Sequence, residues 1–129
     1  MILSIPFLVF SVIAYNAIVF MTGTPFHTVA FEIPMLSGVI WTFTLGDMLI
    51  AGTLFLLFIE ILKATRTSGN SLVDHALSTI VFIVCLIEFL IVPEAATSLF
   101  FFITLVTLID VIAGFSVTIR AARRDFTVG

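Results

Sequence analysis

Four long apolar runs, separated by short polar segments, make up most of the chain. They cover residues 2–21, 39–64, 72–92 and 98–120. About 20 apolar residues in a helix are enough to cross the hydrocarbon core of a bilayer. The mainly apolar part of the third run, residues 77–92, is the shortest, and the run reaches this length only if its helix begins near Ser71. The pattern predicts an all-α, polytopic membrane protein whose four transmembrane helices form an antiparallel bundle.

The polar segments between the runs predict where these helices stop. Pro25 and Pro34 exclude one continuous helix over residues 22–38, so we expect a short piece lying in the membrane interface, with Trp41 as its anchor. Ser71 and Asp74 have the spacing of a helix start, and Pro93 follows the end of the third run. The third and fourth runs should therefore form a helical hairpin within one domain, residues 1–129.

The basic residues predict the orientation. All of them lie at the end of the second or the fourth run or just after it: Lys63, Arg66, Arg120, Arg123 and Arg124. Basic residues near span ends stay in the cytoplasm, so both termini should be cytoplasmic. The first run has no basic residue before it and no small-residue cleavage pattern at its end, so we read it as a retained span.

Composition agrees with a membrane protein and excludes several functions. The chain is 61% hydrophobic and 10% charged, whereas soluble domains carry roughly 25% charged residues. A net charge of −3 gives no footprint for nucleic acid. Cys85 is the only cysteine, and His27 and His75 show no ligand spacing, so we expect no metal and no cofactor. No catalytic motif is present.

Four carboxylates fall inside the predicted spans: Asp47, Glu60, Glu88 and Asp110. An ionisable group at mid-bilayer costs roughly 2.5–3.5 kcal/mol on insertion scales, so such residues have specific roles. Glu60 precedes Lys63 by three positions, which predicts an ion pair near the cytoplasmic end.

The other three carboxylates, together with an amide of the first span, give a candidate intramembrane polar site: Asn16, Asp47, Glu88 and Asp110. No Lys or Arg lies at the depth of Asp47 or Asp110. Three interpretations stay open for these two carboxyls. They are protonated, because burial disfavours the charged form; or hydrogen-bonded by polar side chains of other helices; or they hold a mobile proton or cation.

Three stretches carry a resemblance to a family: FIEILKATRTS (58–68), SLVDHALSTIVF (71–82) and TLIDVIAGFSVTIRAARRDF (107–126). They resemble small four-helix inner-membrane proteins of alphaproteobacterial type, a group without an assigned function. The resemblance implies a bacterial inner-membrane protein and no mechanism. Small multidrug-resistance transporters have a similar length and four spans, but they depend on a glutamate in the first span, where this chain has Asn16.

Two functions follow as hypotheses. The first is a non-enzymatic accessory, assembly or scaffold subunit of a larger membrane complex, whose partners are the lipid bilayer and another membrane protein or a second copy. The alternative is an oligomeric proton- or cation-coupled carrier or channel that uses the intramembrane carboxylates. A third, minor hypothesis is a membrane enzyme or small-ligand binder.

Overall fold

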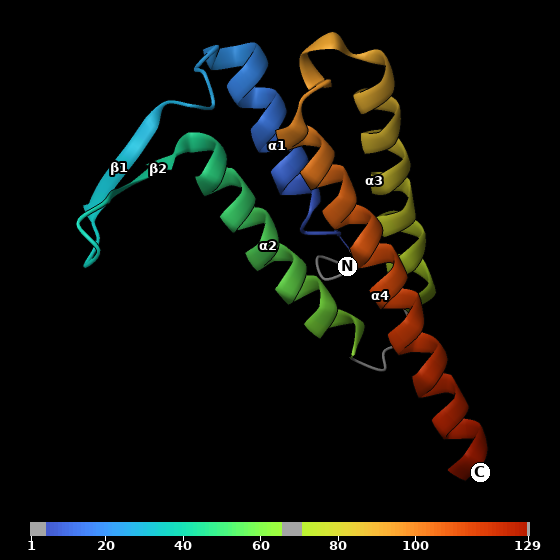
Figure 1. Cartoon of the computed structure of the whole chain (residues 1–129). Helices are drawn as coiled ribbons and strands as arrows, with labels where there is room; N and C mark the ends of the chain where they lie inside the picture. Colours follow the sequence, from blue (N-terminus) through green and yellow to red (C-terminus); the bar gives the residue numbers. More distant parts are fainter. Residues whose placement is uncertain (1–4, 66–70, 129) are drawn as a thin grey trace.

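The computed structural model describes residues 5–65 and 71–128, and the side chains there except those of 71, 118 and 120–128. Helices dominate this part of the chain (Figure 1). They are α1 (Val9–Ala17), α2 (Leu45–Ala64), α3 (Ser71–Ile91) and α4 (Ser98–Val128). A π-helical turn, η2 (Ile18–Thr22), continues α1, and a 3₁₀ turn, η3 (Pro93–Ala95), joins α3 to α4. Two strands, β1 (Val29–Pro34) and β2 (Ile40–Thr44), form an antiparallel hairpin before α2.

Three helices of the described chain are long and apolar enough to cross a membrane. These stretches are Leu45–Ala64, Leu72–Ile91 and Ser98–Val117. The helix formed by α1 and η2, Val9–Thr22, is apolar but shorter. The fold is therefore helical and compatible with a membrane protein.

Helix α4 lies at the centre of the arrangement. It packs against α3 on one side and α2 on the other, while α1 makes fewer contacts, mainly with α2 (Figure 1). A small core joins α1, α3 and α4 through Val12, Tyr15, Cys85, Phe100 and Ile103. We call the end that carries β1, β2 and η3 the hairpin end. The other end, with the last turn of α2 and the first turn of α3, is called the opposite end.

The third apolar run forms the predicted helix, and its predicted helical hairpin with the fourth run is confirmed. Helix α3 ends at Ile91, directly before Val92 and Pro93, and α4 begins at Ser98 and packs back along α3. Helix α4 continues beyond the predicted boundary at 120, to Val128.

The predicted start of the second span, at residue 39, is wrong. Residues 40–44 form β2, and α2 begins only at Leu45. The Thr44 hydroxyl accepts the Asp47 N–H, and the Asp47 carboxylate accepts the Thr44 N–H, each at 3.1 Å. This capping box fixes the helix start because it satisfies backbone donors that a first turn leaves unpaired.

The predicted interfacial piece is a β-hairpin, which the sequence analysis did not anticipate. Phe31 lies opposite Phe43 and Ile33 opposite Trp41 in the register. The turn closes at Gly38, whose φ of 94° is a conformation that side chains other than glycine rarely adopt.

The first helix begins later than predicted. Pro6 lies in the turn before it, and α1 starts at Val9 rather than at residue 2. Residues 2–4 of the predicted span and Arg66 of the predicted loop lie outside the described residues, as do the side chains of Arg120, Arg123 and Arg124.

Candidate functional site

The four residues of the predicted polar site fall in three separate places. Asn16 and Glu88 meet between α1 and α3, Asp47 lies in the first turn of α2, and Asp110 lies among a different set of polar residues toward the opposite end. Among the described residues, the members of the predicted site that lie between helices therefore belong to two polar layers rather than one.

Asp47 lies in the first turn of α2 rather than in the middle of that helix. The predicted second span has Asp47 about eight residues from its start, but α2 begins only two residues before Asp47. Asp47 is exposed, and its carboxylate caps the helix through Thr44. A carboxylate in the first turn also interacts favourably with the helix dipole. Its role in this structure is that of a helix cap.

The layer near the hairpin end ties helices together. The Asn16 side-chain amide donates to the Glu88 carboxylate at 3.2 Å and to the Val12 carbonyl at 3.1 Å. From the neighbouring position on α1, the Tyr15 hydroxyl lies 2.8 Å from the Glu94 carbonyl and 2.9 Å from the Thr97 hydroxyl. These bonds join α1 to α3 and to the η3 turn, as polar side chains commonly do between membrane helices.

A third polar contact links α1 to α2. The fully buried Thr53 hydroxyl lies 2.9 Å from the Ser11 hydroxyl and 2.7 Å from the Leu49 carbonyl. Both hydroxyls thereby have hydrogen-bond partners within the protein. The contact is explained as a link between α1 and α2, and it does not indicate a binding site.

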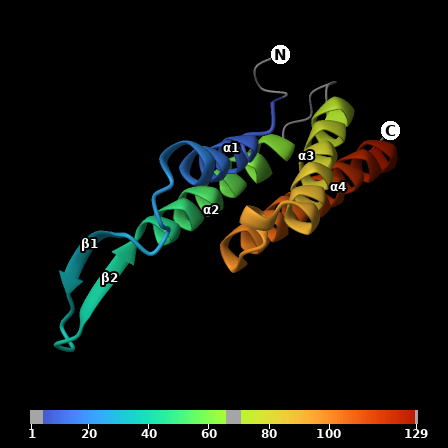
Figure 2. The same cartoon turned by 90° about the horizontal axis from the view of Figure 1, so that it is seen from above.

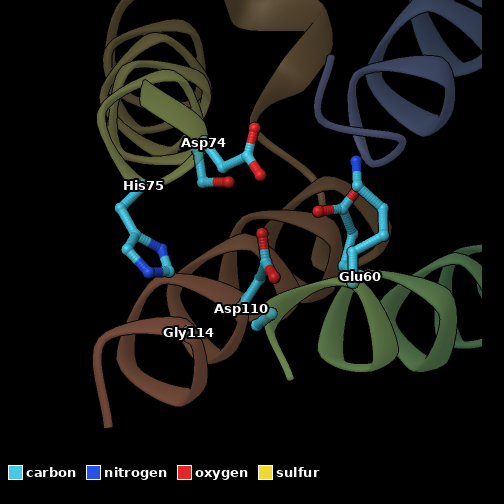
Figure 3. A pocket seen from close by; sticks show the side chains of 8 residues that line it. Glu60, Asp74, His75, Asp110 and Gly114 are labelled. Atoms are coloured by element: carbon cyan, nitrogen blue, oxygen red, sulfur yellow. The ribbon is translucent and has the colours of Figure 1, made fainter. Parts of the chain in front are cut away.

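The layer toward the opposite end is a cluster of ionisable side chains from three helices, which we call the inner cluster. It surrounds a cavity of about 20 Å³, close to the room that one water molecule needs. The lining residues are Glu60, Lys63 and Ala64 of α2, Asp74, His75 and Ser78 of α3, and Asp110 and Gly114 of α4. In Figure 3 the side chains of Asp74 and Asp110 point into the same space, and Glu60 approaches from the other side.

Glu60 and Lys63 anchor the start of α1 to this cluster. They form the predicted ion pair, with Nζ 3.3 Å from Oε1, so that prediction is confirmed. Glu60 also accepts the Phe7 N–H. The Lys63 ammonium donates to the Ile5 carbonyl at 2.9 Å and lies 4.2 Å from the centre of the Phe7 ring. Charge-assisted bonds of this kind are roughly twice as strong as neutral ones.

Asp74 and His75 bring the first turn of α3 into the cluster. The Asp74 Oδ1 atom is buried, and no hydrogen-bond donor reaches it within the described residues. His75 is 6% exposed, and its ring packs 4.8 Å from that of Phe115 and directly against Gly114. The predicted capping role of Asp74 toward Ser71 cannot be compared, because the Ser71 side chain lies outside the described residues.

The inner cluster brings three carboxyl groups, one ammonium and one imidazole into a space with little water. Carboxyl and imidazole side chains are the groups that proteins commonly use to carry protons. No group of three or more His, Cys, Asp or Glu side chains in the described chain is arranged to hold a metal ion.

Sequence reasoning missed the meeting of Glu60, Asp74 and His75 with Asp110. The signal was the end at which each lies: Glu60 is near the end of α2, and Asp74 and His75 are at the start of α3. Residues at these positions share one level of an antiparallel bundle. Asp110 reaches that level because it lies in the second half of the Ser98–Val117 span.

Comparison of the chain with known protein families, curated proteins and solved structures finds no match. The resemblance to alphaproteobacterial inner-membrane proteins stays a prediction.

Proposed function

We propose that the chain is a four-span protein of the bacterial inner membrane, with both termini in the cytoplasm. Three long apolar helices support this topology, and the fourth crossing would be made by α1 with the segment before it. Ile5 and Phe7 are held beside Lys63 and Glu60, and Gly23 ends η2. Residues 5–23 would thus span the same height as α2. The position of Lys63 in the last turn of α2 supports a cytoplasmic opposite end.

In that membrane we propose a non-enzymatic accessory or scaffold subunit that binds the transmembrane helix of another protein. One observation carries this proposal: an apolar groove of about 450 Å³ between α1 and α2. Ser11 and Thr53 hold the two helices together at one level, and α1 packs less extensively on α2 than α4 does.

The shape of the groove suits a helix. Its lining includes the small residues Ser11, Ala14 and Gly52, and a Cβ added to Gly52 would meet no atom within 4 Å. Small residues allow two helix backbones to approach closely. Phe10 and Phe55, which are 52% and 64% exposed, also line the groove. Their rings would pack against the bound helix.

Native mass spectrometry of the chain, gently extracted from its own membranes, tests this proposal. We expect a defined hetero-complex that is lost in Gly52→Leu, because the leucine fills the groove. Ala76→Leu is the matched control, since Ala76 is exposed on α3 away from the groove. Asp47→Asn and Asp110→Asn should leave the complex intact, because an amide still forms hydrogen bonds. A monomer without partner, or equal effects of both leucines, would contradict the proposal.

A second candidate function, a proton- or cation-coupled carrier or channel, is favoured by the inner cluster. Asp110 would be its charge-handling group, with Glu60, Asp74 and His75 around it, and Asp47 would take no part because it is an exposed cap. The buried apolar side chains of Phe100 and Ile103 lie between the inner cluster and the hairpin end on α4, so a pathway would require the helices to move. Flux in liposomes that disappears in Asp110→Asn would support this function, and absence of flux for protons and monovalent cations would exclude it.

A further inference from the structure

In the described part of the chain, no helix packs over the faces of the β-hairpin, and the hairpin residues are mostly exposed. In both views it projects away from the helical region, from the hairpin end of α2 (Figures 1 and 2). Its root is fixed, because Leu45 donates to the Thr28 carbonyl at 2.8 Å and Gly46 to the Phe26 carbonyl at 2.9 Å. The hairpin is therefore held in one direction at the level where α2 begins.

The two faces of the hairpin differ in chemistry. Side chains alternate between the faces of a strand, and directly paired residues share a face. The register places Phe31, Ile33, Trp41 and Phe43 on one face, which we call the aromatic face. Glu32, Pro34, Ile40 and Thr42 occupy the other. The first face is a continuous apolar surface, and the second is mixed and carries the carboxylate.

The aromatic face is ordered but open. The Phe31 and Phe43 rings stack at 4.7 Å between centres, and Trp41 meets both rings edge-on, at 6.3 Å and 5.4 Å. Yet Phe31, Ile33 and Trp41 remain 40–45% exposed. The tip adds Met35 and Leu36, and Leu36 has no cover at all. A two-stranded hairpin with such a surface is marginal in water.

We infer that the hairpin lies flat in the headgroup region of the bilayer at the hairpin end, with its aromatic face toward the acyl chains. Trp and aromatic rings favour that depth. The outer edges of a two-stranded sheet carry backbone groups that need hydrogen-bond partners. The hydrocarbon core offers no such partners, whereas headgroups and water do. The other face would direct Glu32 and Thr42 to the water. Residues 22–44 contain no Lys or Arg, so the attraction is apolar rather than ionic.

Lipid is a better occupant for this surface than a partner protein, because of its position. Strand β2 ends directly before α2, which is long and apolar enough to cross a membrane. If α2 crosses the bilayer, the root of the hairpin lies at the bilayer boundary. In that position the aromatic face would extend the apolar surface that the helices present to lipid. This inference requires the membrane-spanning arrangement but not the accessory function, so either can fail without the other.

Trp41 is the only tryptophan in the chain, so its fluorescence reports on the hairpin without any substitution. The full chain would be reconstituted in phosphatidylcholine vesicles that carry brominated lipids. We expect emission shifted to the blue, quenched most by bromines near the glycerol region, less by bromines at mid-chain, and only weakly by aqueous acrylamide. Strong quenching by acrylamide without quenching by lipid would overturn the inference. So would strongest quenching at mid-chain, or protection from both quenchers.

Two matched variants test which face meets the lipid. Ile33→Asp and Ile40→Asp make the same chemical change on opposite faces, and both positions are exposed. We expect Ile33→Asp to abolish lipid quenching of Trp41 and Ile40→Asp to retain it. A nitroxide on Leu36→Cys in a Cys85→Ala background gives a second reading of depth, remote from the tryptophan. A tip exposed only to aqueous relaxation agents, or loss of lipid quenching in Ile40→Asp alone, would overturn the inference.

Discussion

Gly114 of α4 lies directly under the imidazole of His75 of α3. A Cβ built on Gly114 would come within 2.9 Å of Cε1 and 3.0 Å of Nδ1 of that ring. Contacts under 3.0 Å are essentially never observed for a real Cβ, so the ring and a side chain cannot share this space. Glycine at this position lets α3 and α4 meet beside the inner cluster, where the His75 ring contacts both Gly114 and the ring of Phe115.

The first prediction follows from this contact. Gly114→Ala should lower the free energy of unfolding by about 1–3 kcal/mol, the usual cost of overpacking, because His75 must leave its place. Gly52→Ala is the matched control: it also changes a helical glycine, but its added Cβ meets nothing within 4 Å. That variant should be neutral or slightly stabilising, because alanine is the better helix former. Thermal unfolding in detergent micelles measures both, and equal stabilities would show that the ring adapts freely.

The second prediction concerns Tyr15, which is 1% exposed. Its ring packs at 4.9 Å from Phe26 and 4.8 Å from Phe100, and its hydroxyl bonds to Glu94 and Thr97. Tyr15→Phe keeps the ring and should cost about 1 kcal/mol for the lost hydrogen bonds. Tyr15→Ala also removes the ring and should cost about 3–5 kcal/mol. Unfolding in mixed micelles of increasing denaturing detergent gives both values, and a Tyr15→Phe loss as large as that of alanine would contradict this partition.

Features of the helices that depend on the local sequence could be predicted. Helix α3 ends within one residue of its predicted boundary because Pro93 has no N–H to continue the helical ladder. The Glu60–Lys63 pair was predictable because i,i+3 neighbours share a helix face whatever the helix packs against. Both features depend only on local chain geometry.

The start of α2 was also predictable, but its signal was overridden. Thr44 and Asp47 have capping-box spacing before an apolar run. Four of the six residues 39–44 are large and apolar, and they predicted a longer span instead. Apolar, β-branched and aromatic residues suit a membrane helix and a strand equally well, so periodicity could not separate them. Asp47 was placed too deep as a direct consequence.

The meeting of residues from different helices was beyond the sequence. Asn16 could have faced lipid, α2 or α3, because a helix that is apolar on all sides shows no preferred face. The pairing with Glu88 and the assembly of Asp110 with Glu60 and Asp74 depend on helix rotation. Rotation is set by packing over the whole bundle.

The third prediction measures the Asn16–Glu88 contact. A double-mutant cycle with Asn16→Ala and Glu88→Ala should give a coupling energy of about 0.6 kcal/mol, the average for hydrogen bonds between membrane helices. The coupling should be positive because each substitution leaves the other group without its 3.2 Å partner. Glu32→Ala replaces Glu88→Ala in the control cycle, since Glu32 lies in β1, and should give no coupling with Asn16. A zero value in both cycles would mean that the two side chains bond to other groups in the membrane.

The fourth prediction concerns the attachment of the chain before α1. Glu60 accepts the Phe7 N–H, and Lys63 holds both the Ile5 carbonyl and the face of the Phe7 ring. Glu60→Ala removes the acceptor and leaves a partly buried N–H unpaired, at a cost of about 1–3 kcal/mol. Amide hydrogen exchange of a peptide covering Ile5–Phe10 should therefore become much faster. Exchange in the middle of α3 should not change.

Glu60→Gln and Lys63→Met separate the contributions within this attachment. Glutamine keeps a carbonyl oxygen for the Phe7 N–H but loses the charge that pairs with Lys63, so its peptide should exchange at an intermediate rate. Lys63→Met keeps an apolar stem against Phe7 and removes the bond to Ile5, so exchange should rise chiefly before Phe7. If all three variants left exchange near residues 5–10 unchanged, the start of α1 would be held by hydrophobic packing of Leu8, which is 1% exposed, and the polar attachment would contribute nothing to its stability.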